Sequence, residues 1–161
     1  MANRRCSLPE HDLTLHLVSG EHNSREAIEF VQALDETCAT RWLCYYHPSV
    51  DMTGMDVAHI PAVKRAIEEK RKALFGSRPK PYAMACASKT SEPYFDFWRR
   101  YDSEAGRAFR SLDEAFEWLG LSDAARTAAS VAIERWEAAF DAGSGVAAPQ
   151  APSPDRPPAA P

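Results

Sequence analysis

The sequence lacks several features that identify common classes of protein. Its 19 lysines and arginines against 23 aspartates and glutamates give a formal net charge of -4, so it has no basic excess of the kind that general nucleic-acid binding requires. It has no apolar run long enough to cross a membrane, and no apolar stretch follows the basic start at Arg4 and Arg5 as it would in a signal peptide. We therefore expect a cytoplasmic protein with no integral membrane segment and no nucleic-acid partner.

Metal-binding and catalytic signatures are also missing. The four cysteines (Cys6, Cys38, Cys44 and Cys86) include no C-x-x-C pair, so neither structural zinc nor a disulfide framework is expected. The chain has no G-x-S-x-G, GxGxxG, P-loop or H-E-x-x-H motif. Cys86 could be imagined as a nucleophile paired with a distant histidine, but its apolar strand context favours a buried, inert thiol. We expect no enzyme activity, no cofactor and no metal.

What the sequence does contain is a regular alternation of strand and helix patterns. Alternating or continuous apolar residues predict four strands, at residues 13–18, 42–46, 82–87 and 107–109. A helical pattern follows each strand, with caps predicted at Asn23, Ser91 and Ser111 and with Pro61 in a first turn. The sequence therefore predicts an α/β fold with a mostly parallel four-stranded sheet flanked by helices; a mixed sheet is the open alternative.

The organisation of the chain follows from these patterns and from a change in composition. Residues 1–12 form an N-terminal segment, and residues 13–120 form the α/β domain. A C-terminal helix over residues 121–142, capped by Ser122, carries Trp136 and Phe140 at helical spacing. It either packs on its own domain or meets a partner or a second copy. Residues 143–161 are rich in proline and alanine and are expected to be a disordered tail.

Three stretches carry a resemblance to a known family. They are the strand and loop 42–55, which contains Val50-Asp51-Met52-Thr53-Gly54; the strand 83–87 with the aromatic helix around Phe97 and Trp98; and the closing capped segment 109–119. Together they resemble the bacterial STAS-like proteins, the SpoIIAA-like group with the anti-sigma-factor-antagonist fold. The likeness covers roughly residues 13–120.

The resemblance implies a small regulatory domain that works by docking onto another protein. In the best-studied branch of the family, a partner kinase phosphorylates a serine in a D-S-S-G-like loop. Here Thr53 stands at the matching hydroxyl, and Asp51, Gly54 and Asp56 share its loop, whereas Met52 replaces one serine. A phosphate there would either repel the neighbouring carboxylates or be stabilised by the start of the following helix. The expected partner is a protein, and a homodimer is an open alternative.

Two further clusters suggest a different class, a module that binds a small hydrophobic or anionic ligand. Ser88, Lys89 and Thr90 follow the third predicted strand and offer contacts for an anion. Phe97 and Trp98 belong to an aromatic group denser than one helix face needs, and they could line an apolar pocket. A metal site from His47, Asp51, Asp56 and His59 has no supporting ligand motif; solvated loop groups are the expectation there.

Overall fold

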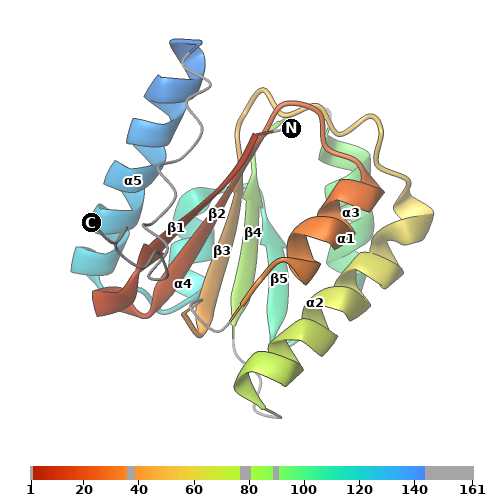
Figure 1. Cartoon of the computed structure of the whole chain (residues 1–161), viewed down its shortest axis with the longest axis horizontal. Coiled ribbons are helices and arrows are strands. Elements are labelled where there is room, and N and C mark those ends of the chain that lie inside the picture. Colours follow the sequence, from red (N-terminus) through yellow and green to blue (C-terminus); the bar gives the residue numbers. More distant parts are fainter. Residues whose placement is uncertain (1, 36–38, 77–80, 89–90, 144–161) are drawn as a thin grey trace, which may run out of the picture.

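The fold is built on a five-stranded mixed sheet with helices on both faces. The computed structural model describes residues 2–35, 39–76, 81–88 and 91–143. The strands are β1 (Ala2–Leu8), β2 (Leu13–Ser19), β3 (Arg41–Tyr46), β4 (Tyr82–Cys86) and β5 (Gly106–Phe109). They are hydrogen-bonded in the order β1-β2-β3-β4-β5; β1 is antiparallel to β2, and every other pair is parallel (Figure 1).

The prediction of four strands is wrong, because β1 adds a fifth at the edge of the sheet. β1 carries few apolar residues: Cys6 and Leu8 pack against the core, while Arg4, Arg5 and Ser7 are exposed. An edge strand needs fewer apolar residues than a central strand, so it lacks the pattern by which a buried strand is recognised. A single 3-10 turn, Pro9–His11, then reverses the chain into β2.

The helices divide between the two faces of the sheet. α1 (Ser24–Gln32), α2 (Ile60–Phe75) and α3 (Glu92–Trp98) cover one face, and α4 (Leu112–Trp118) and α5 (Asp123–Asp141) cover the other (Figure 1). The first three connect successive parallel strands that add in one direction, so right-handed crossovers place all three on the same side. α4 and α5 follow the last strand and return across the opposite face.

Side-chain caps account for most of the helix starts. The capping box of Asn23 and Glu26 is formed at α1, and Ser122 accepts a hydrogen bond from the N–H of Ala125 at α5. Ser111 caps α4 through the N–H of Glu114, as predicted. Ser91 occupies the N-cap position of α3 but makes no side-chain cap; its hydroxyl donates to the carbonyl of Ser88 instead. α1 ends at Gln32, and Cys38 lies outside the described residues.

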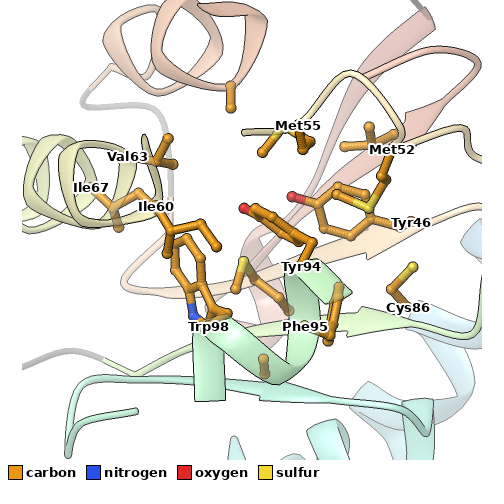
Figure 2. Packing of buried hydrophobic residues seen from close by; sticks show 14 of the residues in the cluster. Tyr46, Met52, Met55, Ile60, Val63, Ile67, Cys86, Tyr94, Phe95 and Trp98 are labelled. Atoms are coloured by element: carbon orange, nitrogen blue, oxygen red, sulfur yellow. The ribbon is translucent and has the colours of Figure 1, made fainter. Parts of the chain in front are cut away.

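The core under α1, α2 and α3 is rich in aromatic and sulfur-containing side chains (Figure 2). Trp98 and Ile60 are fully buried in it, and Phe95 is nearly so. On the other face, leucines of β2 and alanines of β4 meet α4 and α5. Trp136 of α5 is 5% exposed, which confirms that this helix packs on its own domain.

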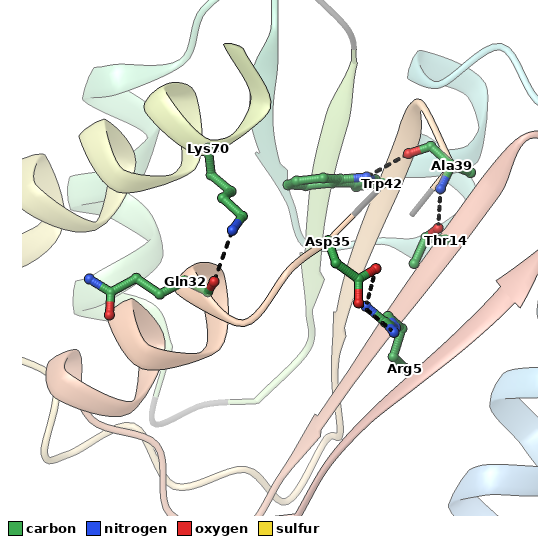
Figure 3. A network of polar contacts seen from close by, with 7 residues as sticks. All are labelled: Arg5, Thr14, Gln32, Asp35, Ala39, Trp42 and Lys70. Carbon is green, nitrogen blue, oxygen red and sulfur yellow. Dashed lines mark hydrogen bonds and ion pairs between the residues drawn. The ribbon is translucent and has the colours of Figure 1, made fainter. Parts of the chain in front are cut away.

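Polar contacts tie the segment after α1 to the sheet and to α2 (Figure 3). Arg5 on β1 pairs with Asp35 at 3.2 Å, and the Lys70 ammonium donates to the carbonyl of Gln32 at 2.9 Å. The N–H of Ala39 donates to the Thr14 hydroxyl at 2.7 Å. These contacts tie the end of α1 and the segment that follows it to β1, to the start of β2 and to α2.

A single glycine in β5 is required by close packing. A Cβ placed on Gly106 would lie 1.9 Å from the Cζ atom of Tyr82, and Tyr82 is buried. We expect Gly106→Ala to lower the free energy of unfolding by about 3 kcal/mol, because the ring or the strand must move. Urea denaturation measures the loss.

Gly54→Ala is the matched control, because its new Cβ would meet only the Cβ of Asn23 at 3.5 Å, an ordinary contact. The same Gly106→Ala change in a Tyr82→Leu background should cost much less, since the clashing ring is gone. Equal costs in the two backgrounds would show that the Tyr82 ring is not what limits this position.

Candidate functional site

The candidate site lies where the parallel strands β2 and β3 end. Beyond these ends, Glu21 and Asp51 form an isolated parallel bridge. The N–H of His22 donates to the carbonyl of Asp51 at 2.8 Å, and the N–H of Asp51 donates to the carbonyl of Gly20 at 2.9 Å. The two loops therefore continue the strand pairing into the region where open α/β sheets generally bind their ligands.

The loop after β3 alternates between anchored and exposed residues. Met52 and Met55 are buried, and Figure 2 shows both side chains directed toward the aromatic core beside Tyr46 and Tyr94. Thr53 lies between the two methionines and is exposed. The buried methionines hold the backbone on either side of the exposed Thr53, whose side chain is hydrogen-bonded to the Asp51 carboxylate. We call residues 51–56 the docking loop, after the role that the resemblance to STAS-like proteins implies for it.

Hydrogen bonds within the docking loop fix its turns. The Asp51 carboxylate accepts from the N–H of Thr53 at 2.9 Å, and this contact lowers the pKa of Asp51. The Asp56 carboxylate accepts from the N–H of Ala58 at 2.9 Å. Both are turns in which an aspartate binds a backbone N–H two residues ahead. Both carboxylates thus support the exposed loop directly.

A polar pocket of about 210 Å³ opens beside this loop. Its lining residues are Glu21, His22, Asn23, Asp51, Thr53 and Gly54. Burial lowers the pKa of His22 to about 4, against an opposing effect of Glu26, so this imidazole is neutral near pH 7. The charged groups of the lining are then two carboxylates, and the pocket favours a positively charged or hydrogen-bond-donating group.

The structure places Ser88 as a brace for the docking loop. Ser88 is 3% exposed, and its hydroxyl donates to the carbonyl of Val50 at 2.9 Å. This contact links the end of β4 to the start of the loop after β3. Lys89 and Thr90, the other two residues predicted to contact an anion, lie outside the described residues.

Phe97 and Trp98 occupy different environments. Trp98 has no exposed surface, and its ring centroid is 5.8 Å from that of Tyr94. Phe97 is half-buried, with the guanidinium of Arg100 5.3 Å from its ring centroid. Neither residue lines the apolar cavity of this face, which lies between the sheet and helices α1 and α2.

That cavity contains two histidines that sequence reasoning did not select. His16 lies on β2 and His22 follows it; both are 2% exposed, and both line the cavity. His22 also lines the polar pocket, so it stands between the two. The only signal in the sequence was a polar residue at position 16 within the strand pattern of Leu13, Leu15 and Leu17. A polar residue at this place in a strand predicts a solvent-facing side chain, because the sequence does not show that a helix covers it.

His47 precedes the docking loop and packs against α5. Its ring lies 5.6 Å from that of Trp136 and 4.8 Å from that of Phe140. Its Nδ1 atom accepts from the N–H of Ser49 at 3.1 Å, and its Nε2 atom is 3.7 Å from a carboxylate oxygen of Asp141. Within the described part of the chain, no three His, Cys, Asp or Glu side chains are grouped to hold a metal ion.

Comparison with known proteins adds no family to this description. No family model matches the sequence, and no curated protein matches it. The resemblance to STAS-like proteins therefore rests on the residues quoted above. In the described part of the chain, no helix combines the length and apolar character needed to cross a membrane.

Proposed function

We propose that the protein is a non-catalytic regulatory or adaptor protein of the STAS-like kind, which docks onto a protein partner through the docking loop. The observation that carries the proposal is the exposure of Thr53 between two buried methionines. A loop held in this way loses little conformational entropy when it binds, so its contacts translate more fully into affinity. Binding through such a preformed loop needs no catalytic group.

The charge of this surface indicates the chemistry of the partner. Glu21, Asp51 and Asp56 place three carboxylates on or beside the docking loop. Opposite charge across an interface speeds association and excludes wrong partners. The proposed partner surface therefore carries lysine or arginine side chains. Phosphorylation of the exposed Thr53 hydroxyl would add negative charge here and strengthen this binding.

Site-specific photo-cross-linking tests the proposal in an extract of the source cells. A photoreactive residue at Thr53 should give a discrete adduct with one protein, whereas the same group at Val131, exposed on α5, should not. Adding Glu21→Lys should reduce the adduct and weaken the purified complex about tenfold, because a favourable charge becomes a repulsive one.

Glu134→Lys on α5 is the matched control for charge, since it reverses an exposed carboxylate on another element. It should leave the adduct and the affinity unchanged. Equal adducts from positions 53 and 131, or an affinity that both charge reversals reduce alike, would contradict docking through this loop.

A further inference from the structure

The cavity between the sheet and helices α1 and α2 has a volume of about 50 Å³. Strands β2 to β4 form its floor, and side chains of α1 and α2 form its walls. The lining includes Phe30 and Val31 from α1, Val63 from α2, and Trp42 and Met84 from the sheet. The cavity is thus predominantly apolar. Among the described residues that line it, His16 has two buried nitrogen atoms without a hydrogen-bond partner, and Tyr82 has one such oxygen atom.

The His16 ring is buried with its hydrogen-bonding capacity unused by the protein. Among the described residues, neither its Nδ1 nor its Nε2 atom has a hydrogen-bond partner. The rings of Phe30 and Trp42 meet it edge-on, with centroid distances of 5.0 and 5.6 Å. These contacts fix the ring but supply no acceptor or donor in its plane. Because buried polar groups are nearly always satisfied, this imidazole indicates a further occupant.

The charges around the cavity indicate the charge and the hydrogen-bonding groups of the molecule that it binds. Burial lowers the pKa of His16 to about 3, and the charges of Arg5 and Arg71 act in the same direction. The neutral ring presents one N–H donor and one nitrogen acceptor. The guanidinium of Arg71 lies 4.1 Å from the ring centroid of Trp42, which lines the cavity. The charges that act on His16 are therefore positive and disfavour a cation. A hydroxyl group, which both donates and accepts, matches the neutral His16 ring.

We propose that this cavity is a binding site for a small, uncharged, largely apolar molecule whose hydroxyl group hydrogen-bonds to His16. A water molecule needs roughly 10–15 Å³ of such space, so the cavity of about 50 Å³ holds only a few heavy atoms. A short-chain alcohol, or the hydroxyl end of a larger neutral molecule, has the required size. The site is separate from the docking loop and does not depend on partner binding.

The probe for this site is 1-propanol, with propylammonium as a cation of the same chain length. In NMR spectra of the full chain with labelled histidine, 1-propanol should shift the His16 ring resonances saturably, with a millimolar dissociation constant. Propylammonium should bind at least tenfold more weakly. Nuclear Overhauser contacts should join the propanol methyl group to the methyl groups of Met84 and Val31.

His16→Phe removes the hydrogen-bonding group while keeping an aromatic ring, and it should abolish saturable binding. His59→Phe is the matched control, because the His59 side chain is 57% exposed, and it should bind as the wild type does. The contacts to Met84 and Val31 test the site in the wild type even if the His16 variant fails to fold. Overhauser contacts from water alone, equal shifts by both probes, or propanol contacts confined to the surface would overturn the proposal.

Discussion

Lowering the pH from 7 to 4.5 should reduce the free energy of unfolding by about 5 kcal/mol through His16 and His22. Their pKa values are lowered to about 3 and about 4 in the folded protein, whereas both return to about 6.5 when the chain unfolds. At pH 4.5 the unfolded chain holds nearly two protons on these histidines, whereas the folded protein holds well under one. Stability is therefore complete above about pH 6.5 and is lost as the pH falls, by roughly 2 to 3 kcal/mol for each histidine at pH 4.5.

Urea denaturation of the wild type and of His16→Phe at pH 7.5, 6 and 4.5 measures this effect. The variant should lose roughly 2 to 3 kcal/mol less than the wild type over this range. Asp51 and Asp102 have shifted pKa values of opposite direction, but they are common to both proteins and cancel in the difference. His59→Phe should follow the wild type. Parallel curves for the wild type and His16→Phe would show that folding does not lower the pKa of His16.

Trp98→Ala should lower the free energy of unfolding by about 4 kcal/mol, the range found for truncating a buried tryptophan. The side chain has no exposed surface, and it fills the space between α3 and α2 in the same cluster as Ile60 (Figure 2). Its indole N–H is buried without a hydrogen-bond partner among the described residues. Trp98→Phe leaves less empty volume and removes that N–H, so it should cost only about 1 to 2 kcal/mol.

Val131→Ala, at the most exposed large apolar side chain of the described residues, is the control and should change stability by less than about 0.5 kcal/mol. The three variants are compared by the midpoint and slope of urea denaturation. A cost below about 1 kcal/mol for Trp98→Ala would mean that Trp98 borders open space. The ligand pocket that the sequence suggested near Phe97 and Trp98 would then regain support.

Much of the fold follows from local patterns. β2 to β5 and the helices after them occupy the predicted intervals, because the period of apolar residues reflects which face of an element is covered. Asn23 and Ser122 were identified as caps because a helix start needs a side-chain acceptor within a few residues. The sequence also places Thr53 in a loop after a strand, and Thr53 is exposed in the structure.

The features that were missed depend on contacts between distant residues. β1 has too few apolar residues to be recognised alone, and its pairing with β2 defines it. Ser91 has the composition of a cap, yet its hydroxyl binds the carbonyl of Ser88. The sequence predicts Trp98 in a pocket, because its helix carries more aromatic residues than one buried face needs. In the structure, α2 covers Trp98.

The sequence by itself determined the alternation of β2 to β5 with their helices, most of the helix starts and the place of the docking loop, because these depend on residues close together in the chain. Only the tertiary structure decided that Ser88 braces that loop and that His16 and His22 are buried. Those outcomes depend on how α1 and α2 cover a sheet whose strands come from separate parts of the chain. Burial also sets the pKa of each histidine, so the chemistry of the cavity arises from packing and not from the residue type.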